Sequence, residues 1–527
     1  MQSLHWIRNF NVTQDDLDYL SGLLLENEQP LGTEALAQAL IERQLQQEAD
    51  LLRDKFKDSL IYNPSQSYDV GQRLIFPVLD FTSGTVVGVR EGKNPAYEPF
   101  RVIEVAFEDE AQNRPEGKRE FAAALQTSHV LAEQGSDSAN TLPGMVDTSA
   151  DEILAQYGDD ILYEVETTLS ESDMLVQVAG EWFARDLMLE VNEGHLHLAE
   201  AVLDIHSGGP MTTEEILNEI GGLGNTSIGL QVFSMNYRMR DDDRFDEVGP
   251  TGEVMWYLRR LEPEAVQQTP VMLEYFSIPY DASLLTPEMQ DLEREIDDEL
   301  SDFAPPSEKL DAVTVTLTYP HRRTGTLPLN ARMRQIFPTA QQTPRVYVTL
   351  VDGQDGEEYP GWVVRKERYI YGLDTFFRKH RLPIGAYVTV QRDEQPGRVI
   401  VNFNAYRPRT EWVRLITPRN NQIAFENHKR SIGAEYDELM ILGADDLQAV
   451  DALFTTTQQQ KRPLAAILKN VISGLGHLTP QGTTHAKTIY SAVNAVKRCP
   501  PGPIFATLVA NPDFQNVGGH YWKVSDS

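Results

Sequence analysis

The side chains whose types and spacing could support catalysis fall into a few small groups. His195 and His197 lie two positions apart in GHLHLAE, with no third ligand near them in the sequence. On a helix this spacing points the two rings in different directions, which favours ordinary core or surface histidines over a metal site. Cys499 follows His477 and His485, but the surrounding CPPGP is typical of a turn and not of an elbow that presents a nucleophile.

A metal-dependent nuclease would need acidic ligands beside a lysine. The residues that fit this requirement are Asp352, Asp355, Glu357, Glu358 and Lys366. Two glycines separate the acidic residues, which is typical of a solvated hairpin tip. The sequence also has no G-x-x-x-x-G-K-[ST] phosphate-binding motif. We therefore expect no catalytic residue, cofactor or metal, and keep the nuclease as a third alternative.

Positive charge is concentrated in one block of the chain. Residues 311–430 contain 19 Lys and Arg against 11 Asp and Glu, whereas the preceding 310 residues contain 20 against 60. The formal net charge is −33, so most of the surface should repel a polyanion and any nucleic-acid contact must be local. Aromatic residues interleave with the cations from Trp362 to Arg381, which is the pattern of a nucleic-acid surface. The alternative is a basic face that docks on the protein's own acidic half.

Length and composition limit the class of protein. A chain of 527 residues with 41% hydrophobic residues can form several domains with their own cores. A single cysteine excludes a disulfide framework and favours a reducing compartment. The first residues lack the apolar core of a secretory signal, and no run of about 18 apolar residues follows them. We expect a cytoplasmic protein.

Hydrophobic periodicity predicts the elements of the first 306 residues. Two helices are expected within 14–45, with the second continuing toward Phe56, and a small antiparallel barrel within 68–109. That barrel resembles Tudor- or KOW-type barrels in its GTVVGVR stretch. Polar loops are expected at 108–120 and 134–150.

Helices at 197–206, 210–220 and 227–239 precede a hairpin at 244–258, which is the order of a winged helix. Residues 30–36 and 210–216 form a weak internal repeat, and Thr286–Phe303 is an acidic-faced helix with a solvated outer face.

Five alternating segments predict the strands of the basic block, at 313–320, 345–353, 361–372, 386–393 and 398–406. A single short helix lies between the third and fourth of them, so a nearly closed pseudobarrel is expected. This block resembles the DNA-binding pseudobarrel of plant transcription factors and some restriction endonucleases. The likeness rests on Trp362, Gly372-Leu373, Phe376-Phe377, Leu382 and Gly385. That family usually has Asp after the last glycine, where this chain has Ala386.

The C-terminal segment predicts helices at 446–454, 463–475 and 484–498 and a wing that closes on Trp522. It resembles the HARE-type winged helix-turn-helix of restriction enzymes, chromatin-linked regulators and the RNA polymerase delta subunit. The residues that carry this likeness are Thr488, Ile489, Val493 and the closing PDFQNVGGHYW. Residues 197–259 are similar in a fainter form. The resemblance implies DNA binding or association with a polymerase.

The expected fold is a multidomain α+β chain in which winged-helix modules alternate with small antiparallel β-barrels. The expected domains are a helical module at 1–62, a small SH3- or Tudor-like barrel at 63–133, a winged-helix-like domain at 149–280, an acidic linker helix at 281–306, a basic pseudobarrel at 307–420 and a HARE-like winged helix at 435–527.

Fifteen residues are predicted to contact nucleic acid. The third helix of a winged helix enters the major groove, so five come from 484–498: Lys487, Tyr490, Asn494, Lys497 and Arg498. The other ten supply the positive field of the pseudobarrel: Arg322, Arg323, Arg332, Arg334, Arg365, Lys366, Arg368, Arg378, Lys379 and Arg381.

The sequence thus predicts a non-enzymatic, DNA-associated binding protein linked to transcription or defence. The alternative is an acidic interaction scaffold or RNA polymerase-associated factor, in which the N-terminal 310 residues bind a basic protein. The two hypotheses differ in where the arginines of 311–430 lie. They either form a positive face or pair with the chain's own acidic helices.

Overall fold

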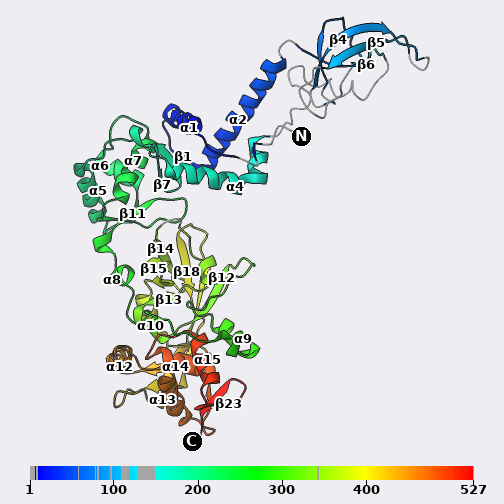
Figure 1. Cartoon of the computed structure of the whole chain (residues 1–527). Helices are drawn as coiled ribbons and strands as arrows, with labels where there is room; N and C mark the ends of the chain where they lie inside the picture. The colour runs from blue at the N-terminus through cyan, green and yellow to red at the C-terminus, as the bar shows by residue number, and fades with distance from the viewer. Residues whose placement is uncertain are drawn as a thin grey trace. The chain divides into compact units, whose positions relative to one another are not determined.

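The computed structural model describes residues 6–7, 10–56, 59–76, 79, 82–94, 98–107, 118–126, 149–340 and 343–525. These residues form two compact units, Met1–Met188 and Leu189–Ser527, which both combine helices and β-sheets (Figure 1). The polar loops predicted at 108–120 and 134–150 lie almost wholly outside the described residues. Within the described parts, no helix combines the length and apolarity needed to span a bilayer.

Three helices and a small sheet form the base of the N-terminal unit. The helices are α1 (Gln14–Asn27), α2 (Thr33–Phe56) and α4 (Ala150–Glu171). The sheet has the order β1 (Leu31–Gly32), β8 (Glu181–Ala184), β7 (Leu175–Val178). The indole nitrogen of Trp182 donates to the Thr33 hydroxyl at 2.9 Å. The helices predicted within 14–56 are confirmed. The domain expected at 149–280 is divided between the two units, because its first 40 residues belong to the N-terminal unit and pack on these helices.

Along the chain, the strands of a five-stranded sheet come between α2 and α4. Its order is β2 (Leu60–Ile61), β3 (Arg73–Phe76), β4 (Thr82–Glu91), β5 (Arg101–Phe107), β6 (Lys118–Ala123). The neighbours from β3 to β6 are antiparallel, as the sequence predicts for 68–109, but β6 begins at Lys118, inside the loop predicted at 108–120. Phe76, Val86, Ile103 and Val105 belong to its core.

One order of elements occurs three times: helix, two-residue strand, helix, helix and hairpin. In the N-terminal unit the five-stranded sheet interrupts this order between the second and third helices. The second copy is α5 (Glu193–Ile205), β9 (Met211–Thr212), α6 (Thr213–Ile220), α7 (Ile228–Arg240), β10 (Phe245–Glu247) and β11 (Met255–Leu258). The third is α13 (Leu464–Gly476), β22 (Thr484–His485), α14 (Ala486–Asn494), α15 (Pro501–Ala510), β23 (Phe514–Gly518) and β24 (Tyr521–Val524). In every copy the last hairpin strand lies between the other two strands.

The basic block forms a nearly closed, barrel-like sheet of seven strands. Their order is β12 (Ala312–Thr316), β17 (Tyr387–Arg392), β18 (Arg398–Asn402), β14 (Arg345–Asp352), β15 (Glu358–Val364), β16 (Tyr369–Tyr371), β13 (Thr326–Pro328). Two short helices accompany them, α10 (Tyr319–Thr324) and α11 (Asp374–Lys379), whereas the sequence predicts one. The missed helix begins with Pro320 in its first turn, a position where proline favours a helix start.

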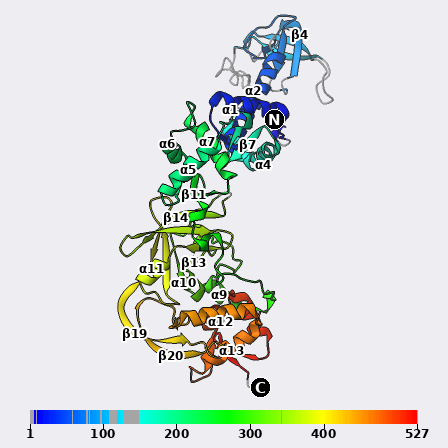
Figure 2. The same cartoon turned by 90° about the vertical axis from the view of Figure 1, so that its left-hand side faces the viewer.

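A long hairpin joins the barrel to the C-terminal helices. It consists of β19 (Ala405–Ile416) and β20 (Phe425–Ala434), and β21 (Leu442–Ala444) pairs with the other edge of β19. Figure 2 shows the two strands as a curved pair beside α11 and α12 (Leu447–Gln459). Only the start of this hairpin is predicted from the sequence, within the strand at 398–406.

The acidic helix is shorter than predicted. It is α9 (Pro287–Ile296), and Asp297, the C-cap residue after it, has a φ of 48° in the left-handed region. The following Asp297, Asp298 and Glu299, which we name the acidic turn, are buried. The expectation that this helix continues to Phe303 with a solvated acidic face is therefore wrong at its C-terminal end.

A histidine caps α14 and makes its stability sensitive to pH. His485 Nδ1 accepts a hydrogen bond from the Lys487 backbone N–H at 3.1 Å. Burial, with the nearby His520 and Lys487, lowers the pKa of His485 to about 4. Because the folded pKa lies below the unfolded one, the stabilisation is complete above about pH 6.5 and is lost as pH falls toward 4, by roughly 2–4 kcal/mol. We expect the midpoint of urea unfolding to fall over this range, and less so in His485→Asn, which keeps a capping acceptor that does not titrate. Identical pH profiles for the two proteins would contradict this assignment.

Candidate nucleic-acid interface

The five contacts predicted on the C-terminal helix do not form an exposed face. Four of them are buried: Lys487, Tyr490, Asn494 and Arg498. Lys497 is half-exposed and makes no ion pair with any described residue. Most of them lie on α14, which is the second helix of its copy and not the third. The third helix is α15, which begins where the sequence predicts a turn and a wing. The expectation that these side chains face a DNA groove is corrected for this reason.

The acidic turn forms ion pairs and hydrogen bonds with buried polar side chains on and next to α14. Arg498 Nη2 lies 2.6 Å from a carboxylate oxygen of Asp298 and 2.6 Å from one of Glu299. The Tyr490 hydroxyl donates to Asp298 at 2.5 Å, and His321 Nε2 lies 3.1 Å from Glu299. Burial opposes ionisation of Glu299, but the charges of Arg498 and His321 hold its pKa below the ordinary value. These groups form one ionic network inside the C-terminal unit.

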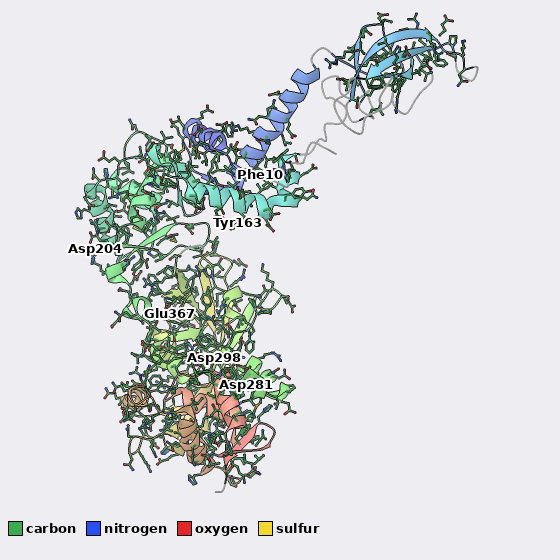
Figure 3. The ribbon with its side chains drawn as sticks, viewed as in Figure 1. Phe10, Tyr163, Asp204, Asp281, Asp298 and Glu367 are labelled. Carbon is green, nitrogen blue, oxygen red and sulfur yellow. The ribbon has the colours of Figure 1, made fainter. Side chains whose placement is uncertain are left out.

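The same turn also binds two of the predicted barrel cations. Arg332 Nε lies 2.6 Å from Asp297, and Arg368 Nη1 donates to the backbone carbonyl of Glu299 at 3.1 Å. Figure 3 labels Asp298 where the barrel strands meet the C-terminal helices. The acidic turn therefore joins the barrel to the last module. The two barrel cations that it binds are among the residues predicted to contact DNA.

Lys379 lies inside the acidic group that suggested a nuclease. Its ammonium is 2.8 Å from Asp352, 2.6 Å from Asp355 and 2.7 Å from Glu357. Hydrogen bonds to these three carboxylates raise the pKa of Lys379. Lys366, the lysine expected beside them, is exposed in the turn before β16. In the part of the chain that the structure describes, no cluster of three or more His, Cys, Asp or Glu is placed to hold a metal ion.

Other groups considered for chemistry or DNA contact have separate positions. The Asn192 N–H donates to His195 Nδ1 at 3.3 Å, and burial raises the pKa of Cys499 to about 12. Arg365 donates to the carbonyl of Thr343 at 2.9 Å. Arg334 is exposed, and like Lys366 it makes no ion pair with the described residues.

Four of the ten predicted barrel cations converge on one pocket. Arg322 and Arg323 come from α10, Arg378 from α11 and Arg381 from the turn after it. Arg430 of β20 joins them, around a cavity of about 460 Å³. The apolar side chains that line it are Leu382, Pro383, Ile384, Val413, Ile432 and Leu442. We name this site the arginine pocket.

The arginine pocket keeps a positive charge. Three of its arginines have carboxylate partners at 2.5–2.9 Å, in the pairs Arg323–Asp451, Arg378–Asp374 and Arg430–Asp445. The other two, Arg322 and Arg381, make no ion pair with the described residues. Burial lowers the pKa of Arg322, whose Nε donates to the Leu382 carbonyl at 2.9 Å. Arg381 is exposed and has a φ of 51°.

The pocket has the chemistry of an anion site. Guanidinium groups present forked N–H donors that fit the oxygens of a phosphate or carboxylate. An apolar floor can at the same time cover the sugar or base that a phosphate carries. The volume lies within the roughly 300–1,000 Å³ of sites that hold a small ligand.

The hairpin side of this site, including Arg430, is not among the predicted contact residues. The signal is present, because alternating runs at 409–416 and 425–434 flank the turn residues Asn420 and Asn421.

Comparisons of this chain with protein-family models, with curated proteins and with solved structures found no match. The likenesses to the pseudobarrel and HARE families stay predictions. The candidate interface rests on its residues and their geometry.

Proposed function

We propose that this protein is a non-enzymatic, DNA-associated binding protein, linked to transcription or defence, whose contact with DNA is the arginine pocket. The observation that carries the proposal is the convergence of five guanidinium groups from three elements and a turn on one apolar floor. Phosphate oxygens are suitable acceptors for these groups. The net charge of −33 repels DNA from most of the surface, so the contact must be local, as this site is.

In this proposal the three repeated copies are winged-helix modules, the last of them of the HARE type, and the seven-stranded sheet is the DNA-binding pseudobarrel. The third helices are then α4, α7 and α15. The α4 helix contains seven carboxylates and no Lys or Arg, and α15 has no charged residue and is largely buried. The α7 helix ends in Arg238 and Arg240, but three aspartates follow it and Asp241 pairs with Arg240. None of the three helices suits a DNA groove, so the pseudobarrel provides the DNA contact and the modules serve protein contacts.

An acidic scaffold or RNA polymerase-associated factor is a second candidate. It is favoured by the ion pairs that neutralise Arg332, Lys379 and Arg498 within the chain. It is also favoured by α4, where Tyr163 is 73% exposed among the carboxylates (Figure 3). A basic protein would bind that helix.

The salt dependence of DNA binding tests the first proposal. Fluorescence anisotropy with the full chain and a labelled oligonucleotide should show binding at low salt. If two to five arginines meet phosphates, the logarithm of the affinity should fall with the logarithm of the salt concentration with a slope of about −1.5 to −4.5. The absence of binding at low salt would contradict the proposal and leave the scaffold.

A further inference from the structure

An exposed tryptophan lies in the middle of the hairpin. Trp412 is 65% exposed on β19, while Trp182, Trp256, Trp362 and Trp522 are buried. It is paired across the hairpin with Lys429, whose Nζ lies 5.0 Å from the centre of the indole. An open aromatic face beside a cation is the arrangement on which nucleic-acid bases stack.

The residues around Trp412 suit a polyanion. Directly paired residues of antiparallel strands share a face, so Thr410 and Ser431, and Arg414 and Asn427, lie on the side of Trp412. None of these is a carboxylate. The charged residues on this side are Lys429 and Arg414, both cations, and Arg414 Nη1 donates to the Glu438 carbonyl at 3.0 Å. This exposed side, which we name the tryptophan face, is therefore basic and aromatic.

The hairpin does not have the form of a ribbon that enters a duplex groove. β21 pairs with one edge of β19, and the opposite face covers the buried Val413, Ile432 and Ile441. The tryptophan face is exposed, whereas Val413, Arg430 and Ile432 on the opposite face line the arginine pocket. A β-ribbon that reads the major groove must instead fit inside it.

The arginine pocket is also unsuited to a duplex. Its cavity of about 460 Å³ has the size of a small-ligand site and can take a nucleotide, but not a double helix. The third helices of the proposed modules add no basic groove-reading surface: α4 is acidic, α15 is largely buried, and α7 is followed directly by three aspartates, the first of which pairs with its Arg240 at 3.2 Å.

We propose that the DNA bound by this protein is single-stranded and passes round the hairpin edge at β20, with a phosphate in the arginine pocket on one face and a base stacked on Trp412 on the other. The inference rests on the proposed function, because it specifies the form of the DNA. Stacking on a β-sheet is tolerant of sequence, so the protein should bind single strands of different sequence with similar affinity.

Substitution of Trp412 tests the inference. Anisotropy titrations of the full chain should show tighter binding of labelled oligodeoxythymidine than of a duplex of the same length. Trp412→Ala should weaken binding of the single strand by about tenfold or more, whereas Trp412→Phe keeps most of it. The single strand should also quench tryptophan fluorescence in the native protein and quench it much less in Trp412→Phe. Because Trp412 is exposed, both variants should have the circular dichroism of the native protein.

Two outcomes would overturn the inference alone. They are equal affinity of the native protein and Trp412→Ala for the single strand, and tighter binding of the duplex. Either result leaves DNA binding intact, so the proposed function stands. Failure of the native protein to bind either form would instead overturn the proposed function and this inference together.

Discussion

Replacing Arg498 by methionine should lower the free energy of unfolding of the C-terminal unit by about 3–5 kcal/mol. Arg498 is buried, and its loss leaves Asp298 and Glu299 without their cation in a site that water does not reach. It also removes the donor at 2.9 Å from the Asn494 side-chain oxygen. Urea unfolding of the full chain, followed by hydrogen exchange in peptides of α14, measures this loss.

Arg294→Met is the matched control for Arg498→Met. Arg294 is exposed on α9 and pairs with Asp291 at the surface, where an ion pair contributes between about 0 and 1 kcal/mol. The pH dependence gives a second test. Because the folded pKa of Glu299 is lowered, the network stabilises fully above about pH 4.3 and less as the pH falls further. The difference between the native protein and Arg498→Met should therefore shrink in acid. Equal stability of the two methionine variants would show that the network is not needed for the fold.

Reversing the two unpaired charges of the arginine pocket should abolish DNA binding at low salt. Arg322→Glu with Arg381→Glu removes two cations and adds two carboxylates, so the pocket becomes net negative. Each charge-assisted hydrogen bond contributes about 1.5–3 kcal/mol, so the loss of two corresponds to roughly 100-fold or more in affinity. Anisotropy with the same oligonucleotide measures the effect.

Two further variants separate this effect from misfolding and from net charge. Arg381→Glu alone changes an exposed side chain and should weaken binding without a change in stability. Arg294→Glu makes the same change of charge on α9, which does not line the pocket, and should leave affinity nearly unchanged. If Arg294→Glu and Arg381→Glu weaken binding equally, net charge and not the pocket determines the affinity.

Local signals in the sequence predict much of the fold. Alternating runs locate the barrel strands, and Thr286 with Pro287 locates the start of α9, because strand period, caps and first-turn prolines act over a few residues. The end of α9 has no such signal. The buried Asp298 is paired with Arg498, which lies 200 positions further along the chain. A local pattern carries no information about so distant a partner.

The candidate site is only partly predictable for the same reason. The convergence of Arg322, Arg378 and Arg430 depends on how the hairpin folds back on the barrel. On α14, polar residues such as Lys487 and Tyr490 indicate a surface in the sequence, yet both are buried and bonded to carboxylates almost 200 positions away, Glu295 and Asp298. Prolines at 500, 501 and 503 favour a turn in the sequence but lie at the start of α15, where a helix tolerates them.

The five-stranded sheet inside the first repeated copy has a consequence for folding on the ribosome. β1 pairs with β8, so Leu31 meets Trp182 only after the whole intervening sheet has been synthesised. Until then the apolar sides of α1 and α2 lack the strands and helix that cover them in the native unit. Such long-range pairing slows folding and exposes apolar surface. Nascent chains that end before about residue 184 should therefore bind chaperones more than chains that extend past it.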